Sequence, residues 1–436
     1  MTIFGVAFAV GLLIVLIAVF RVQPFIAFIV TALIAALVLG LSLEQIPKSI
    51  ERGIGDMLGP LSIVICLGAM FGKLIADSGA AQRIAEALMR LFGPGRVPLA
   101  MAITGFVVGI PLFYNVGFVL MVPLVFSVVY RSKLPAMLVG IPMLSGLSIA
   151  HGFLPPHPSP TALVTQFGAD MGLTLLYGSL IAIPTLLIAG PLFARSLKGI
   201  VAVPSELFKP TTLDESQLPG TFNSFACALL PVFLIGVATA LAYAGFDPET
   251  NKLIAFLGNP MIVMLASLFA GSITLGVARG AKLGDLMTGY GHAIRDIAGI
   301  LLIIAGAGAL KQVFVDSGVN TELAALLGNI PIHPLVLGWL VAFAIRIALG
   351  SATVAGLTAA GIVAPLIEVS GVNPNMMVLA VGAGSLMCSH VNDSAFWMFK
   401  EYFQVSLRDT FRSWTMMETL VGSLGLVFVL ILNALL

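Results

Sequence analysis

Residues 151–160 read HGFLPPHPSP and place two histidines and four prolines inside a chain that is 59% hydrophobic and only 9% charged. Proline lacks a backbone donor and interrupts helices, so such a run within lipid would leave carbonyl groups without partners. Irregular backbone at membrane depth is tolerated where it is buried in protein or lines a watery cavity. The stretch therefore indicates helices that break around an internal cavity.

Composition sets the class of protein. The chain has 436 residues, a net charge of +1 and a mean hydropathy of +1.09, whereas a soluble protein would have about a quarter of its residues charged. We expect an integral protein of the lipid bilayer with no nucleic-acid partner, because nothing here could neutralise a row of phosphates. The sequence has no HExxH, GxSxG or GxxxxGK[ST] motif, so we expect neither an enzyme nor a nucleotide-driven pump, and neither a metal nor a cofactor.

The chain contains an internal repeat. GKLIADSGA at 72–80 resembles KQVFVDSGV at 311–319, which pairs Asp77 with Asp316 at an offset of 239, and the same offset pairs His151 with His390. We predict a first repeat over 1–195, a polar linker over 196–221 and a second repeat over 222–436.

Each repeat contains the same series of apolar runs. Long runs are expected to span the membrane at 3–20, 23–41, 57–77, 173–194, 224–245, 259–278, 296–316 and 414–436. Paired shorter runs, 97–110 with 117–130 and 335–349 with 355–369, predict two re-entrant hairpins, because a helix of about 14 residues is only about 21 Å long. Runs 134–150 and 375–389 predict two broken helices. The fold class is thus an all-α polytopic membrane protein of two inverted repeats with about ten transmembrane helices.

The basic residues orient this arrangement. Fifteen of the 21 lysines and arginines fall on one side of the predicted membrane and three on the other, with Lys73, Lys311 and Arg346 inside runs. Because cytoplasmic loops hold the excess of positive charge, the linker should be cytoplasmic and both termini periplasmic.

The helix breaks supply the candidate binding residues. Discontinuous helices in inverted repeats mark transporter binding sites near the midplane. The breaks PLFYN (111–115), HGFLPPHPSP, GSATV (350–354) and HVNDS (390–394) contain Asn115, His151, His157, Ser159, Ser351, Thr353, Asn392, Asp393 and Ser394. These hydroxyl and amide groups suit a small hydroxylated solute, although Asn115 and Thr353 could instead cap helices and His151 could be a core histidine.

Arg346 and Asp393 are charged residues for which the sequence allows more than one role. Arg346 is predicted within the second hairpin and could bind a substrate carboxylate through its guanidinium fork, or could pair structurally with a carbonyl or with Asp393. Asp393, His151 and His390 are the candidates for carrying a coupled proton, since buried ionisable groups are costly unless used.

Four long motifs resemble a known family. HGFLPPHPSPTAL (151–163), GSATVAG (350–356), HVNDSAFW (390–397) and GHAIRDIAGILLIIAGAGALKQVFVDSGV (291–319) are similar to those of the gluconate permease (GntP) family, which belongs with the ion-transporter superfamily. The resemblance covers essentially the whole chain. It implies proton-coupled uptake of gluconate or a related sugar acid across the bacterial inner membrane by an elevator-like motion.

Other substrates and mechanisms stay open at this point. The family's members also carry idonate, glycerate and D-serine, and the sequence does not choose among them or between proton and sodium. A channel is the less favoured rival, because a duplicated plan with broken helices favours alternating access. A homodimer is also compatible with the sequence.

Overall fold

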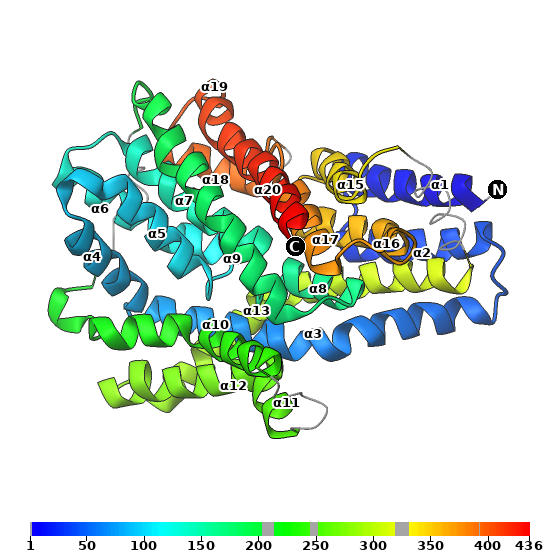
Figure 1. Cartoon of the computed structure of the whole chain (residues 1–436), viewed down its shortest axis with the longest axis horizontal. Coiled ribbons are helices and arrows are strands. Elements are labelled where there is room, and N and C mark those ends of the chain that lie inside the picture. Colours follow the sequence, from blue (N-terminus) through cyan, green and yellow to red (C-terminus); the bar gives the residue numbers. More distant parts are fainter. Residues whose placement is uncertain (1, 203–212, 245–251, 319–330, 392) are drawn as a thin grey trace.

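The computed structural model describes residues 2–202, 213–244, 252–318, 331–391 and 393–436. Within these ranges every regular element is a helix, as expected (Figure 1).

The described part of the segment predicted as the first repeat contains nine α-helices. They are α1 Thr2–Ile14, α2 Pro24–Val38, α3 Gln45–Asp77, α4 Ala80–Phe92, α5 Val97–Gly109, α6 Tyr114–Ser132, α7 Ala136–Phe153, α8 Pro158–Phe167 and α9 Met171–Leu187. Short π-helical turns, Val15–Val19 and Ile188–Leu192, extend α1 and α9. Gln23 caps α2 and Asp170 caps α9, each accepting a backbone N–H of the first turn.

The described part of the segment predicted as the second repeat contains ten α-helices. Its helices are α10 Thr221–Tyr243, α11 Lys252–Gly258, α12 Pro260–Gly271, α13 Leu283–Asp316, α15 Pro334–Leu349, α16 Ala352–Ser370, α17 Pro374–Leu386, α18 Ser394–Phe403, α19 Leu407–Thr410 and α20 Met416–Leu435. Most bounds lie within three residues of the predicted runs.

The helices are long and apolar enough for a multi-pass membrane protein. Eight in the described ranges could cross a bilayer, or nine if α4 and α5, which meet at 108°, form one span. Others, including α2, α15 and α17, are shorter apolar helices. The count of ten crossings, like the inverted relation of the repeats, stays a prediction.

Helices α3 and α13 form the long axis of the molecule and lie side by side (Figure 1). A methyl group added at Gly53 would lie 2.4 Å from the carbonyl oxygen of Gly308, and one at Gly308 would lie 2.4 Å from the carbonyl oxygen of Gly53. Glycine at both positions lets the two backbones approach, as small residues do between membrane helices. Both helices begin about a dozen residues before the predicted runs at 57 and 296, because their first turns are polar.

Four interruptions divide the helices that surround the centre. Two are the tips between α5 and α6 and between α15 and α16, and two are the breaks between α7 and α8 and between α17 and α18. Gly350 ends α15 with φ +74° and Ser351 caps α16, so glycine supplies the left-handed turn that the second tip requires. Nearly every side chain of α7 and α17 is buried, which is why these helices are apolar on all faces.

The described end of the linker is held by basic residues of several segments. Arg83 Nε donates to the Pro219 carbonyl at 2.8 Å, Arg90 contacts Glu215 at 2.5 Å, and Arg279 donates to the carbonyls of Gln217 and Ser78. The ends of α3 and α4, the turn at 277–280 and the linker therefore meet at one end of the molecule.

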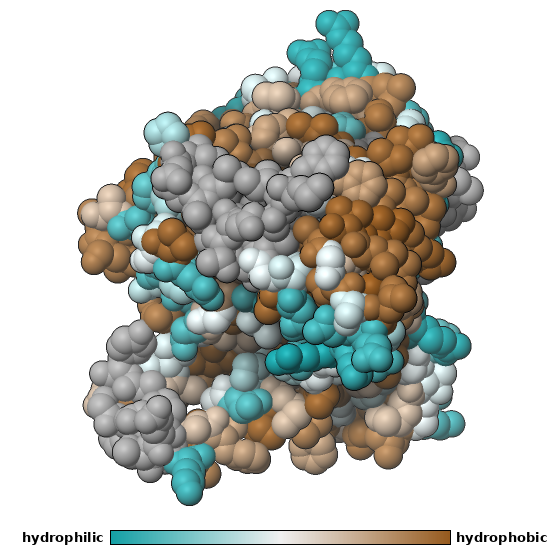
Figure 2. All heavy atoms as spheres, turned by 90° about the vertical axis from the view of Figure 1, so that its right-hand side faces the viewer, coloured by the Kyte–Doolittle hydropathy of each residue, from teal (hydrophilic) through white to brown (hydrophobic). Residues whose placement is uncertain are grey.

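The surface has both apolar and hydrophilic areas at the end of the molecule where α1, α2 and the start of α3 lie. Figure 2 shows broad apolar areas there, with hydrophilic side chains gathered between them. Elsewhere large apolar side chains such as Phe233 and Phe269 are exposed, as expected for helices that face lipid.

Candidate functional site

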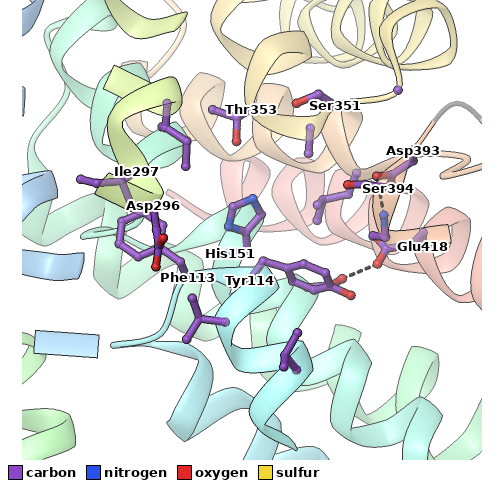
Figure 3. A pocket seen from close by; sticks show the side chains of 18 of the residues that line it. Phe113, Tyr114, His151, Asp296, Ile297, Ser351, Thr353, Asp393, Ser394 and Glu418 are labelled. Carbon is purple, nitrogen blue, oxygen red and sulfur yellow. Dashed lines mark hydrogen bonds between the residues drawn. The ribbon is translucent and has the colours of Figure 1, made fainter. Parts of the chain in front are cut away.

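A cavity of about 820 Å³ lies where the interrupted helices meet, within the range of small-molecule sites. Both hairpin tips and one helix break contribute to its wall, through Phe113 and Tyr114, through Gly350 to Thr353, and through Asp393 to Ala395. Helices α3, α7, α13, α17 and α20 and the turn Phe411–Thr415 complete the wall. Figure 3 shows His151 between the side chains of Ser351 and Thr353 on one side and Tyr114 on the other.

Among the described helices, three begin at the cavity wall. The first residues of α6, α16 and α18 are Tyr114, Ala352 and Ser394, and each lines the cavity. A helix N-terminus presents unpaired N–H groups and a partial positive charge, so it attracts anions. Three such termini around one cavity, with little fixed positive charge, make a surrounding suited to a carboxylate.

Arg346 and Asp393 form a buried ion pair beside the cavity. The guanidinium donates through Nη2 to Asp393 Oδ2 and through Nη1 to the Gly350 carbonyl, which ties the hairpin tip to the start of α18. Asp393 also accepts from Ser389 Oγ at 2.5 Å and from the Ala395 N–H at 3.0 Å. Arg346 thus pairs with a carbonyl and with Asp393, as the structural alternative in the sequence analysis expects.

Aromatic rings gather beside this pair. The Tyr114 ring lies 5.7 Å from the His151 ring and 6.1 Å from the Trp414 ring, measured between centroids. The indole Nε1 of Trp414 donates to Ser389 Oγ at 2.7 Å, which links the ring cluster to the partners of Asp393. His151 Nδ1 and Arg346 Nε are buried without hydrogen-bond partners in the described part of the chain. These atoms are available to a ligand or to water.

The structure brings six predicted site residues to the cavity: His151, Arg346, Ser351, Thr353, Asp393 and Ser394. Asn392 lies outside the described residues. Asn115 is in the first turn of α6, and its side chain is likewise outside the described part.

Three predicted residues lie behind the wall instead. His157 is 4% exposed and its Nε2 lies 2.7 Å from the Gly109 carbonyl at the end of α5. Ser159 is 3% exposed and packs against Gly356, where an added Cβ would lie 2.9 Å from its Oγ. His390 hydrogen-bonds to the backbone of Ile347 near the end of α15. Their positions suit holding the hairpins rather than contacting a solute.

Several cavity residues were missed by the sequence reasoning. They are Lys73, Asp77, Tyr114, Ser148, Asp296, Trp414 and Glu418. The clearest is Glu418, a carboxyl 2% exposed in the first turn of α20. An acidic residue inside an apolar run was the signal available, since such residues are costly in a membrane.

A family model described as GntP family permease matches residues 1–435. The chain belongs to the GntP permease family. Members of this family are permeases and not enzymes, which confirms the expectation from the motifs.

Curated relatives match this permease over nearly their full length. A Gnt-II system L-idonate transporter of Escherichia coli is 46% identical over 435 residues, covering 99% of each chain. A high-affinity gluconate transporter of the same organism is 45% identical, with 98% of each chain covered. A gluconate permease of Bacillus subtilis is 42% identical, again with 98% of each covered.

Two solved transporters share the fold. The YdaH transporter of Alcanivorax borkumensis has a TM-score of 0.68 at 16% identity, with 94% of this chain and 97% of that chain covered. The Neisseria gonorrhoeae protein MtrF, whose structure is described as illuminating a class of antimetabolite efflux pumps, has a TM-score of 0.66 at 16% identity, with 94% of each covered. At this identity the likeness concerns the fold alone.

Proposed function

We propose that this permease is a secondary active transporter that takes up gluconate or a related sugar acid together with a proton. The names of the relatives support the substrate class, and the observation that carries it is the convergence of three helix N-termini on one cavity with several hydroxyl groups. A sugar acid combines one carboxylate with a row of hydroxyls, so it matches both features.

The residues divide into those that meet the solute and those that shape the wall. The N-termini of α16 and α18 would receive the carboxylate, where Ser351, Thr353 and Ser394 line the cavity. His151 and Tyr114 lie opposite them and would meet the hydroxyls (Figure 3). Asn115 and Asn392, at the starts of two of these helices, belong to the same proposal.

For Arg346 the contacts favour a positioning role over the direct carboxylate clamp. Two of its nitrogens are already engaged by Asp393 and the Gly350 carbonyl, so a bidentate hold on a solute would require their release. Held in this way, Arg346 neutralises Asp393 and fixes the hairpin tip. The sequence candidates for proton coupling are Asp393, His151 and His390, to which the cavity adds the buried carboxyl of Glu418.

Alternating access by an elevator-like motion is the mechanism that the packing supports best. Helices α5–α9, α15–α18 and α20 pack mainly with one another around the cavity, and α1–α3 and α10–α13 form a second group (Figure 1). The first group would carry the solute and the second would stay fixed in the membrane. In a homodimer, helices of the fixed group would form the contact between the two copies.

The proposed setting is the bacterial inner membrane, with the linker cytoplasmic and both termini periplasmic. The cavity reaches the Lys73–Asp77 pair at the end of α3, whose side chains are 35% and 55% exposed. That end of α3 is the one held near the linker by Arg279. The cavity would therefore face the cytoplasm.

Reconstitution in proteoliposomes tests the proposal. Labelled gluconate should accumulate against its gradient when the outside is made acidic, and trapped unlabelled gluconate should drive counterflow. Idonate should compete, and glycerate and D-serine should compete less well. Flux that only dissipates a gradient would indicate a channel, and uptake that follows a sodium gradient instead would overturn proton coupling.

A further inference from the structure

We propose that Glu418, hydrogen-bonded to Ser148, is the proton-binding site of this permease, an inference that rests on the proposed proton-coupled function. Neither residue was among the sequence candidates, and both line the cavity.

The two oxygens of the Glu418 carboxyl have different surroundings. Oε1 accepts a hydrogen bond from Ser148 Oγ of α7, whereas Oε2 is buried and has no partner among the described residues. Figure 3 shows the Glu418 side chain directed toward the cavity near the hydroxyl end of Tyr114. Oε2 is therefore the oxygen with no hydrogen bond to keep, and it is the atom that we assign to carry the proton.

The contrast with Asp393 identifies which carboxyl exchanges the proton. Asp393 is paired with Arg346 and accepts two further hydrogen bonds, so its charge is compensated. Glu418 takes part in none of the ion pairs within the described ranges, and its one donor is a neutral hydroxyl. An uncompensated carboxylate at this depth is costly, whereas the protonated carboxyl is neutral and avoids that cost.

The neighbours of α20 offer Glu418 no cation of its own. The charged groups that act on it are Arg346 of α15 and Asp393, which are already paired with each other. The other ionisable groups of the cavity wall are Tyr114 of α6, His151 of α7, Asp296 of α13 and the paired Lys73 and Asp77 of α3. The facing helices α9 and α17 carry no Asp, Glu, Lys, Arg or His. The turn Phe411–Thr415 before α20 carries Arg412, whose exposed side chain lies 3.9 Å from Asp409.

Proton binding and solute binding are coupled because Glu418 and the sugar acid would occupy the same cavity. When Glu418 is ionised, its negative charge repels the carboxylate of a sugar acid that approaches the N-termini of α16 and α18. When Oε2 takes a proton from the solution, that repulsion disappears and the anion is admitted. The proton and the anion would then cross together, and the proton leaves Oε2 once the solute has been released.

Calorimetric titration of the purified protein with gluconate tests the assignment directly. Above the pH at which Glu418 ionises, wild-type affinity should fall about tenfold per pH unit, and buffers of different ionisation enthalpy should report uptake of about one proton per gluconate bound. Glu418→Gln, which resembles the protonated acid, should bind with an affinity that no longer depends on pH and should take up no proton. The same variant should lose pH-driven accumulation in proteoliposomes.

Two further variants separate the outcomes. Glu401→Gln removes an exposed carboxyl on α18 and should keep the wild-type pH dependence. If Glu418→Gln does not fold, Ser148→Ala should still shift the pH midpoint of binding by removing the hydrogen bond to Oε1, and an unshifted midpoint would overturn the assignment. A folded Glu418→Gln protein whose binding still weakens as pH rises would also overturn it. Wild-type protein that accumulates no sugar acid under a pH gradient would instead refute the proposed function.

Discussion

The two halves of the chain build one cavity from the same kinds of break but contribute different chemistry to it. To the buried part of its wall the first half supplies Tyr114, Ser148 and His151, whereas the second supplies the charged side chains of Arg346, Asp393 and Glu418. The charged Lys73–Asp77 pair of the first half lies at a more exposed part of the wall. At the offset of 239, Arg346 corresponds to Val107 and Asp393 to Leu154, so the ion pair has no counterpart in the first half. Both halves contain helix breaks, whereas one anion requires buried charge only once. A second buried ion pair would add its own desolvation cost.

The histidines show the same divergence. His151 and His390 match in the repeat, yet His390 bonds to the end of α15 while the matching contact in the first half, to the end of α5, is made by His157. His151 is thereby free to face the cavity. A repeated contact can thus move to another residue and release the original one for function.

Breaking the ion pair of the second half should have the largest effect. Asp393→Asn leaves the Arg346 guanidinium buried without its counter-charge, which should lower the free energy of unfolding by about 3–5 kcal/mol. Thermal unfolding of the purified protein in detergent measures the loss. Arg346→Gln combined with Asp393→Asn should recover part of it, and a double mutant that is as unstable as the sum of the single losses would contradict the pairing.

Disturbing the close packing of α5 against α7 in the first half should cause the next largest loss of stability. A methyl group at Gly105 of α5 would lie 1.9 Å from the Met143 carbonyl oxygen of α7, so Gly105→Ala must push the helices apart and should cost about 1–3 kcal/mol or more. Gly299→Ala in α13 is the control, since nothing lies within 4 Å of its added methyl. Equal unfolding temperatures for the two variants would show that α5 and α7 do not pack this closely.

The histidine contacts can be ranked against each other. His157→Phe leaves the buried Gly109 carbonyl without its hydrogen-bond donor and should cost about 1–3 kcal/mol. His390→Phe should cost less, because His390 is only partly buried, and His292→Phe on an exposed face of α13 should change little. A larger loss for His390 than for His157 would reverse the roles assigned to the two histidines.

Removing a contact between α4 and the linker should have the smallest effect on stability, and this effect should depend on pH. The hydrogen bond from Arg90 lowers the pKa of Glu215, so this pair stabilises the fold above the unfolded-state pKa of the carboxyl and the contribution is lost as the pH falls through the folded-state pKa. Both side chains are exposed, so Arg90→Ala should lower the unfolding temperature only slightly at neutral pH. The difference should vanish in acid. A difference that persists there would mean that Arg90 acts through packing.

The sequence predicted the fold well where local chemistry determines it. Pro111 and Gly350 mark the two tips, and the bounds of α5, α6, α15 and α16 agree with the predicted runs to within three residues. Helix α4 was not predicted, because its alternation of apolar and charged residues does not resemble a membrane span.

The composition of the site was less predictable. Arg346 and Asp393 are 47 residues apart, and the sequence placed both near mid-membrane without deciding that they meet. Glu418 was overlooked since hydropathy reports the depth of a residue in a run and not which face of the helix turns inward. Ser148 reaches Glu418 only because α7 packs against α20. Contacts between helices distant in sequence determine such partners.

The most direct test of the account is whether a sugar acid occupies this cavity. Thr353→Cys in a protein whose Cys66, Cys227 and Cys388 are replaced by serine provides a thiol in the cavity wall, and Ser216→Cys in the exposed linker provides the control. The rate of alkylation of each thiol is measured with and without gluconate. At ten times the dissociation constant, gluconate should slow alkylation at position 353 about tenfold and leave position 216 unchanged. Equal rates at position 353 with saturating gluconate, in a protein that still transports it, would contradict the assignment of the cavity as the binding site.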